Sequence, residues 1–170
     1  SMDHETFMRL ALQQAQQALA NQEFPVGAVI VAGGEPVAMG RRVNSRNETA
    51  NELDHAEVVA LRDLLARRPE IARDTLTVYS TMEPCLMCYS AMLLNGIRNF
   101  VYAYEDAMGG GTSLQLMNLT PLYQTMAPEV RILPHILRRE SLELFKAFFT
   151  SPANDYWQGS LLADYTLAQP

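Results

Sequence analysis

The sequence predicts an α/β fold built on a mixed β-sheet, and three observations lead to it. Short runs rich in β-branched and aromatic residues alternate with longer segments whose apolar residues recur at helical spacing. Gly33 and Gly34 lie between two of the strand-like runs and predict the turn of an antiparallel hairpin. Two later runs flank one predicted helix, and a strand–helix–strand unit places its two strands parallel.

The elements follow in order along the chain. The run 24–31 is almost continuously apolar, which is typical of a strand buried on both faces. Gly96 follows the third helix where glycine commonly ends a helix, and Ser141 resembles the first residue of a capping box. Strands are predicted over residues 24–31, 36–42, 75–80, 99–104 and 129–133, and helices over residues 4–20, 54–67, 84–95, 114–119, 141–149 and 155–167.

Composition indicates a globular chain of one domain, because it has 170 residues, of which 48% are hydrophobic and 19% charged. No segment has the features of a signal peptide, and no apolar run reaches the roughly 18 residues of a membrane-spanning helix, so we expect no membrane contact. Ser1 before Met2 is interpreted as a remnant of cloning. Two cysteines that are expected to be reduced metal ligands indicate the cytoplasm.

Two short stretches carry the residues that can do chemistry. Asp54-His55-Ala56-Glu57 holds one of the three histidines, and Glu83-Pro84-Cys85-Leu86-Met87-Cys88 holds both cysteines. One imidazole and two thiolates make three zinc ligands, the number found in catalytic zinc sites that leave the fourth position to water. Glu57 stands two residues after the histidine, where it can serve that water instead of binding the metal. The pattern predicts one Zn²⁺ ion per chain.

Both stretches are expected at the first turn of a helix. Asp54 is a candidate N-cap of a helix that begins near His55, and Pro84 suits the first turn of the helix that carries the cysteines. Cys85 and Cys88, three residues apart, then share one face of that turn, where the helix N-terminus favours ionised thiols. Two helix N-termini pointing at one metal ion are therefore predicted.

Other interpretations of the cysteine pair are open. Two cysteines at this spacing can be a redox centre or half of a structural zinc site. A closed structural site normally has four protein ligands, and the chain has no third cysteine. A redox pair gives no role to His55 and Glu57. His4 is interpreted as an exposed terminal residue and His135 as a loop or cap residue, and neither is expected to bind the metal.

The combination of His-x-Glu with Pro-Cys-x-x-Cys matches the signature of zinc nucleobase deaminases, and the chain resembles the cytidine-deaminase-like superfamily. It is most similar to the branch that contains tRNA adenosine deaminases, guanine deaminases and fungal-type cytosine deaminases. The resemblance extends from the first helix to about Ser113, with anchors at residues 25–29, 55–57 and 83–88. It implies a three-layer α/β/α fold with a five-stranded mixed sheet, and a homodimer in which the neighbouring subunit borders the pocket.

The resemblance also implies roles for particular residues and a reaction, the hydrolytic deamination of an amino-substituted nucleobase to its oxo form with release of ammonia. By this likeness, His55, Cys85 and Cys88 hold zinc and Glu57 moves the protons. Asn44, eleven residues before the histidine, matches the family's base-contacting asparagine. Three further residues are taken as substrate-binding candidates: Val29, Ala56 and Glu83.

The substrate is open at this point. A free base or nucleoside agrees with the net charge of −6 and with a C-terminal extension, residues 151–170, that is able to close a pocket. The tRNA enzymes commonly end in a basic helix, whereas no lysine or arginine follows Lys146. A tRNA adenosine deaminase is the first alternative, with Arg41, Arg42 and Arg46 as candidate phosphate contacts. A non-catalytic zinc-binding interaction module is the second, and the intact His-x-Glu motif argues against it.

Two segments outside the motifs are given provisional roles. The three glycines at residues 109–111 lack the Gly-x-x-x-x-Gly-Lys pattern of a phosphate loop, so we interpret them as a flexible rim of the pocket. The aromatic residues Tyr156, Trp157 and Tyr165 belong to the last predicted helix. They can cover a pocket or a subunit partner, although packing on the chain's own core is the favoured interpretation.

Overall fold

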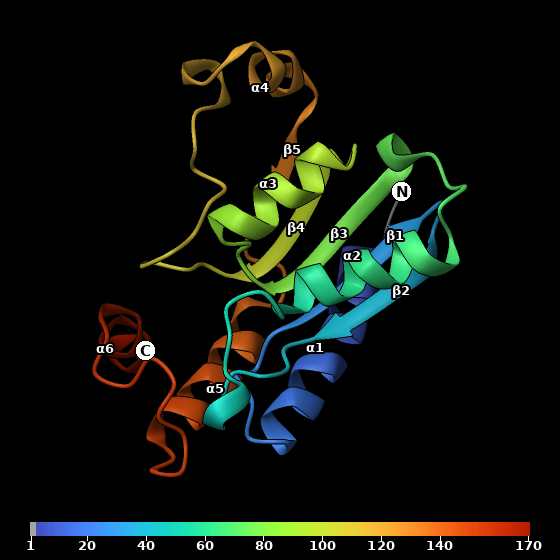
Figure 1. Cartoon of the computed structure of the whole chain (residues 1–170). Coiled ribbons are helices and arrows are strands. Elements are labelled where there is room, and N and C mark those ends of the chain that lie inside the picture. The colour runs from blue at the N-terminus through green and yellow to red at the C-terminus, as the bar shows by residue number, and fades with distance from the viewer. Residues whose placement is uncertain (1–2) are drawn as a thin grey trace.

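The structure is a computed structural model that describes residues 3–170; Ser1, and with it the interpretation as a cloning remnant, lies outside the described residues. Five strands form one mixed sheet in the order β2-β1-β3-β4-β5 (Figure 1). The first three are antiparallel neighbours, and β4 is parallel to both β3 and β5. The strands are β1 (Gly27–Ala32), β2 (Glu35–Arg41), β3 (Leu76–Met82), β4 (Asn99–Tyr104) and β5 (Arg131–Leu133).

Helices cover both faces of this sheet, so the predicted three-layer fold is confirmed. In Figure 1, α2 and α3 lie over one face, and α1 and α5 lie behind the opposite face. α4 belongs to an excursion between β4 and β5, and α6 follows α5 at the C-terminus. The helices are α1 (His4–Ala20), α2 (Ala56–Arg67), α3 (Leu86–Leu94), α4 (Pro121–Met126), α5 (Arg138–Thr150) and α6 (Leu161–Ala168).

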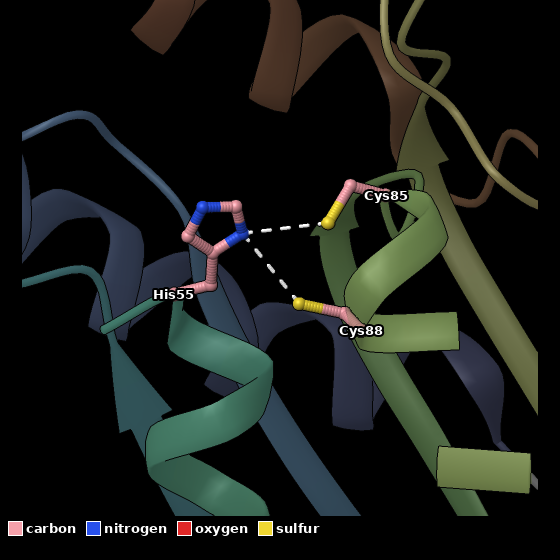
Figure 2. Close-up of side chains that lie close together, drawn as sticks. All are labelled: His55, Cys85 and Cys88. Carbon is pink, nitrogen blue, oxygen red and sulfur yellow. Dashed lines mark hydrogen bonds between the residues drawn. The ribbon is translucent and has the colours of Figure 1, made fainter. Parts of the chain in front are cut away.

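The two helices that carry the motifs begin later than predicted. His55 is the N-cap residue of α2, and Cys85 is the N-cap residue of α3. The prediction of Asp54 as a cap is wrong because its carboxylate accepts hydrogen bonds from the side-chain amides of Asn44 and Asn51, each at 2.8 Å. The starts of α2 and α3 nevertheless face one another, as Figure 2 shows, so the predicted convergence of two helix N-termini is confirmed.

The C-terminal helices also differ from their predicted limits. α5 begins at Arg138, and Ser141 lies inside it, buried, with its hydroxyl donating to the carbonyl oxygen of Thr81 at 2.6 Å. α6 begins only at Leu161, because Ser160 caps it and residues 155–160 form turns. The chain takes positive φ at Trp157 (57°) and Gly159 (72°), which no helix can include.

The excursion after β4 is the part that the sequence predicted least well. The helix expected over 114–119 is only a short 3-10 turn at Leu116–Asn118. α4 was not predicted; it begins at Pro121, a residue suited to the first helical position. Pro128, two residues after the end of α4, prevents the α-helix from extending further, because proline has no backbone N–H to donate.

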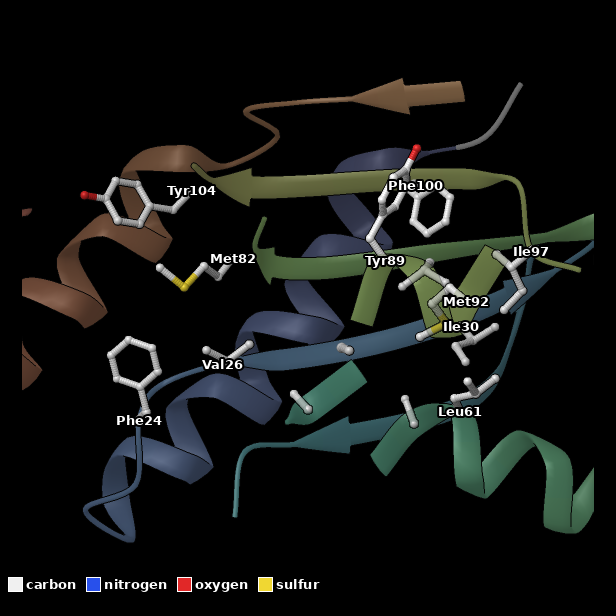
Figure 3. Packing of buried hydrophobic residues seen from close by; sticks show 14 of the residues in the cluster. Phe24, Val26, Ile30, Leu61, Met82, Tyr89, Met92, Ile97, Phe100 and Tyr104 are labelled. Carbon is white, nitrogen blue, oxygen red and sulfur yellow. The ribbon is translucent and has the colours of Figure 1, made fainter. Parts of the chain in front are cut away.

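The core lies between the sheet and its helices. Ala28 and Ile30 belong to the cluster formed with α2 and α3, and Val29 and Val31 to the cluster formed with α1, which confirms a strand buried on both faces. The larger cluster continues along the sheet to Phe24 (Figure 3). The ring of Phe24 packs against Phe145 and Phe148 of α5, with ring centroids 5.1 and 5.2 Å apart. This end of the core forms the floor of the candidate site. Among residues 3–170, no helix has the length and apolar character needed to cross a membrane.

Candidate metal centre and its pocket

Three side chains from the starts of α2 and α3 converge on one point. Nδ1 of His55 lies 3.5 Å from Sγ of Cys85 and 3.5 Å from Sγ of Cys88 (Figure 2). Both cysteines are free thiols, so they are not joined as a disulfide. The cap position of His55 and the N-cap and third helical positions of the cysteines place all three donors off the ends of their helices.

The spacing of the three donor atoms fits a tetrahedral zinc ion. Zinc binds sulfur at about 2.3 Å and imidazole nitrogen at about 2.0–2.1 Å, so two such ligands on one tetrahedral ion lie about 3.6 Å apart. The nitrogen–sulfur distances of 3.5 Å agree with that value. Within the described part of the chain, this is the group of histidine, cysteine and acidic side chains whose donor atoms are close enough to share an ion. With three protein ligands, such an ion keeps one position open.

The three donor groups differ in how readily each loses its proton. The hydrogen bond with Cys88, together with His55, lowers the pKa of Cys85 to about 4. The same contact with Cys85, together with burial, raises the pKa of Cys88. Burial lowers the pKa of His55, but the Cys85 sulfur, Glu57 and Glu52 outweigh it and bring the pKa to about 9. At neutral pH these shifts leave Cys85 ionised, whereas Cys88 and His55 hold protons that a divalent cation would have to displace on binding.

Glu57 stands beside this cluster without belonging to it. It lies in the first turn of α2 and is only 3% exposed. Burial, and next the charge of Cys85, raise the pKa of Glu57 to about 7, although His55 opposes the shift. A carboxyl group that gains and loses a proton near neutral pH is suited to general acid–base chemistry. Its side chain lines the cavity in front of the three donors.

A cavity of about 620 Å³, including its open mouth, is lined by His55 and Cys85 of the three donors, whereas Cys88 lies buried behind them. This volume is in the range of pockets that hold small ligands. Of the predicted substrate-binding residues, Ala56 and Glu83 line it. The sequence did not single out several others that do so: Phe24, Val26, Glu52, Met82, Asp106 and Leu162.

The two remaining substrate-binding candidates do not line the cavity. Val29 is fully buried against α1, so the structure contradicts its assignment. The error follows from strand alternation, since neighbours in β1 point to opposite faces of the sheet. The side-chain amide of Asn44 donates to Asp54 in the loop before α2, and its backbone has a φ of 54°. Contact between Asn44 and a base therefore stays a prediction.

Glu83 supports the rim of the cavity. Its carboxylate accepts hydrogen bonds from the backbone N–H of Asp106 (3.1 Å) and from the N–H and hydroxyl of Thr112 (3.2 and 2.5 Å). A Cβ atom on Gly110 would lie 2.5 Å from this carboxylate, so the loop can approach only because residue 110 is glycine. Gly109 lines the cavity, as predicted for a rim, and the hydrogen bonds of Glu83 hold this rim in place.

The C-terminal segment covers the cavity. Tyr156 and Trp157 both line it, so the less favoured interpretation, in which these aromatic residues cover a pocket, holds for two of them. The favoured interpretation also holds in part, because Tyr156 and Tyr165 pack against the main hydrophobic cluster. Tyr165 lies elsewhere and donates to Glu105 at 2.7 Å. Glu52 and Tyr156 are 104 residues apart, and no periodic pattern in the sequence connects them.

The other residues with predicted polar roles have partners within the chain. Nδ1 of His4 lies 2.8 Å from the hydroxyl of Tyr79, and His135 is a loop residue beside Glu105. Arg42, one of the three candidate phosphate contacts, is 2% exposed and donates to the backbone carbonyl of Asn51 at 2.7 Å. The other two also donate to groups of this chain: Arg41 to Gln17, and Arg46 to Asn21 and Gln22.

Comparisons with curated proteins identify relatives of this chain. A tRNA-specific adenosine deaminase of Streptococcus pyogenes is 30% identical over 155 residues, which cover 88% of this chain and 92% of that protein. The tRNA-specific adenosine deaminase subunit tad2 of Schizosaccharomyces pombe is 33% identical over 147 residues. That match covers 86% of this chain but 37% of the yeast protein.

Solved structures of the same fold agree. One from a study of A-to-I editing by tRNA:A34 deaminases at the wobble position has a TM-score of 0.65 at 27% identity, covering 82% of this chain and 98% of that one. Guanine deaminase from Bacillus subtilis has a TM-score of 0.55 at 31% identity, covering 65% of this chain and 73% of that one. Residues 1–104 match the cytidine and deoxycytidylate deaminase zinc-binding region. The chain therefore belongs to this family of zinc-binding deaminases.

Proposed function

We propose that this protein is a zinc-dependent hydrolase that deaminates a free nucleobase or nucleoside and releases ammonia. The observation that carries the proposal is the cavity that Glu57 lines beside the His55–Cys85–Cys88 group, with Tyr156 and Trp157 also in its wall. We place the protein in the cytoplasm, where free thiols stay reduced. Family membership supports deaminase chemistry, and the cavity supports a small substrate.

In this proposal, His55, Cys85 and Cys88 hold one zinc ion. Bound zinc supplies a Lewis acid that lowers the pKa of water from 15.7 to about 7. Glu57 would take one proton from the attacking water and place it on a ring nitrogen of the substrate while the water oxygen bonds to the carbon that bears the amine. Glu57 would then carry the second water proton from the new hydroxyl to the amine, so that the C–N bond breaks, ammonia leaves and the oxo group forms. Burial suits Glu57 to both directions of transfer, because it brings the pKa of the carboxyl group to about 7.

A small substrate is supported by the surroundings of the cavity. The mouth is bordered by Tyr156 and Trp157, which offer flat apolar surfaces to a planar ring. The acidic side chains of Glu52 and Asp106 also line it, which is unfavourable for a polyanionic backbone. Arg42 also lines the cavity, but its guanidinium donates to the backbone carbonyl oxygens of Asn51 and Asp54 and is therefore engaged within the chain.

A tRNA adenosine deaminase is the second candidate function. It is favoured by the curated relatives, since proteins of this name are 30–33% identical over most of the chain. In this case the substrate adenosine would have to enter past the C-terminal segment. The two functions differ in their dependence on salt, because phosphate contacts weaken steeply as the salt concentration rises.

We also propose that the protein is a homodimer. α3 is apolar on its outer face as well as its inner one: Leu86 and Leu94 are both 54% exposed. An apolar helix face of this kind is typical of a protein interface. Leu94→Glu is expected to yield a monomer in analytical ultracentrifugation, whereas Leu53→Glu, at a more exposed leucine outside α3, is expected to leave the dimer intact. A wild-type protein that sediments as a monomer would contradict the proposal.

One assay discriminates among the functions. Zinc-loaded protein is incubated with guanine, cytosine, adenine, their nucleosides and an anticodon stem-loop, followed by ammonia release and by mass spectrometry. Deamination of any of them adds about one mass unit, because an amine becomes an oxo group. Turnover of a base or nucleoside is the expected result. Turnover of the stem-loop alone would establish the second function, and ammonia release from none of them would overturn the catalytic proposal.

A further inference from the structure

The carboxylate of Glu52 joins the metal centre to the C-terminal segment. Its Oε1 lies 3.1 Å from Nε2 of His55, the ring nitrogen that faces away from the cysteines. The hydroxyl of Tyr156 donates to the same carboxylate, at 2.8 Å from Oε1 and 2.9 Å from Oε2. Nη2 of Arg42 lies 3.5 Å from Oε2. Although the Glu52 side chain is 59% exposed, it thus has three polar partners from three parts of the chain.

The contact with His55 bears on the use of that imidazole as a ligand. A neutral imidazole binds a metal through one ring nitrogen and carries its proton on the other. Here Nδ1 faces the sulfur atoms, so the proton belongs on Nε2, and the Nε2–H group donates a hydrogen bond to the carboxylate of Glu52. A carboxylate in this place fixes the tautomer, orients the ring and makes the imidazole a better donor to the metal.

Glu52 is itself held from two sides. Arg42 is buried, and its guanidinium donates to the backbone carbonyls of Asn51 and Asp54, on either side of Glu52 in the loop before α2. The same guanidinium lies over the ring of Tyr156, at 5.4 Å from the ring centroid. Tyr156 packs in turn on Phe24 at the edge of the core, with ring centroids 5.0 Å apart. The carboxylate is therefore fixed in place despite its exposure.

We infer that Glu52 is a positioning residue that orients His55 for zinc. The hydroxyl of Tyr156 holds the Glu52 carboxylate in place and so links the C-terminal segment to the metal centre. The inference rests on the proposed function, because it takes His55 as a zinc ligand. Removal of a carboxylate that orients a metal-bound histidine typically weakens metal binding by about 10- to 100-fold. We expect a loss of this size for Glu52→Ala.

The test measures zinc affinity by competition with a chromophoric chelator, so it does not depend on turnover. Glu52→Gln keeps an oxygen that accepts the Nε2 proton but loses the charge that attracts Arg42, and it should bind zinc more tightly than Glu52→Ala. Tyr156→Phe removes the hydroxyl that holds the carboxylate, and a smaller loss of affinity is expected. Glu48→Gln is the matched control, because it makes the same change in the same loop at an exposed residue, and its zinc affinity should equal that of wild type.

Thermal unfolding of the zinc-free variants separates positioning from a merely structural role. If Glu52 only stabilised the loop, Glu52→Ala would lower the zinc-free midpoint and leave the affinity for zinc unchanged, and that result would overturn the inference. A wild-type protein that binds no zinc, or a Cys85→Ser variant that binds it as tightly as wild type, would instead overturn the proposed site. The failure of the inference and the failure of the proposed function are thereby distinguished.

Discussion

Glu57 combines two properties that usually exclude one another, since it is almost fully buried and yet can carry a charge. Its neighbours are the thiols and the imidazole of the metal group, and α2 presents it to the cavity from its first turn. Glu83 is also buried in the cavity wall, but its carboxylate is occupied by three hydrogen bonds from the rim. We therefore propose Glu57 as the residue that transfers protons.

The variant Glu57→Ala is expected to keep zinc and lose catalysis. The three metal donors are untouched, so the zinc content by elemental analysis should stay at one ion per chain. The rate of ammonia release should fall by about 10²- to 10⁴-fold, the usual contribution of a general acid–base residue. Asp63→Asn, which changes a carboxylate farther along α2, serves as the control and should retain full activity. Undiminished turnover in Glu57→Ala would exclude this role.

A second prediction for a single residue concerns Gly110 in the rim of the cavity. In Gly110→Ala, the new Cβ atom would lie 2.5 Å from the carboxylate of Glu83, so the rim must move or its hydrogen bonds must break. We expect a loss of about 1–3 kcal/mol in the free energy of unfolding, as for other overpacked sites. Gly109→Ala is the matched control in the same loop, because its Cβ atom would be no closer than 3.3 Å to Asp106. Equal denaturation midpoints for the two variants would contradict this explanation.

At the scale of elements, α5 and α6 are tied to the end of β4 through one carboxylate. Arg138 donates to both oxygens of Glu105 at 2.8 and 2.7 Å, and Tyr165 of α6 donates to it at 2.7 Å. Partial burial would raise the pKa of Glu105, but the bonds from Arg138 and Tyr165 outweigh it and lower the pKa to about 2. Both helices are thus fixed to the strand from which the cavity rim departs.

Because of the lowered pKa of Glu105, we expect the stability of the protein to depend on pH. The pKa of Glu105 is lower in the folded protein than its ordinary value of 4.5, so its stabilisation is complete above about pH 4.5 and is lost as the pH falls toward 2. At pH 7, Glu105→Gln should lower the free energy of unfolding by about 1–2 kcal/mol, measured by urea denaturation. The difference from wild type should shrink as the pH is lowered through this window.

Glu129→Gln is the control for Glu105→Gln, because Glu129 is 62% exposed and pairs with Arg98. Solvent around the exposed Glu129 carboxylate screens this pair, so we expect it to contribute about 0–1 kcal/mol. If the difference between Glu105→Gln and wild type were the same at pH 7 and at pH 2.5, Glu105 would not be the group that titrates.

Most element types were predictable from the sequence, except in the excursion after β4, and two helix starts were mispredicted because the expected capping side chain has another partner. Residues 99–104 form β4 as predicted, because a short run of β-branched and aromatic residues after Gly96 favours a strand over a helix. Asp54 is a good N-cap residue by type, but Asn44 and Asn51 engage its carboxylate. Ser141 likewise serves Thr81 instead of a helix start. Such competing contacts depend on the fold.

At the scale of the whole molecule, we propose that residues 151–170 extend a single domain and belong to its core. Leu162 of α6 is 2% exposed, joins the main hydrophobic cluster and lines the cavity. The hydroxyl of Thr166 lies 2.9 Å from that of Tyr104, at the end of β4. The segment therefore closes the pocket and completes the core at the same time.

Leu162→Ala tests this position. Truncation of a buried leucine leaves a cavity and typically costs 2–5 kcal/mol, so we expect the free energy of unfolding to fall by roughly this amount and the Michaelis constant to rise. Leu167→Ala is the matched control in the same helix, because Leu167 is 44% exposed. It should change stability by less than about 0.5 kcal/mol. Equal effects of the two substitutions would show that α6 is not part of the core.

The metal donors were predictable because chemistry restricts them to a few residue types at fixed spacing: His55, Cys85 and Cys88 lie together as expected. The wall of the cavity was less predictable, because Glu52, Asp106 and Tyr156 come from three loops that only the fold assembles. Neither the hydrophobic period nor a motif distinguishes such loop residues from other polar residues at the protein surface. Contacts across more than a hundred residues, such as that of Glu52 with Tyr156, leave no local signal.

Trp157 is the only tryptophan of the chain, and its indole lies at the mouth of the cavity, 42% exposed. The intrinsic fluorescence of the protein at tryptophan wavelengths therefore originates from one place, within reach of whatever enters. A purine or pyrimidine that stacks there should quench the emission. Titration of unlabelled ligands against this natural reporter would yield dissociation constants even for Glu57→Ala, which we expect to bind substrate without converting it.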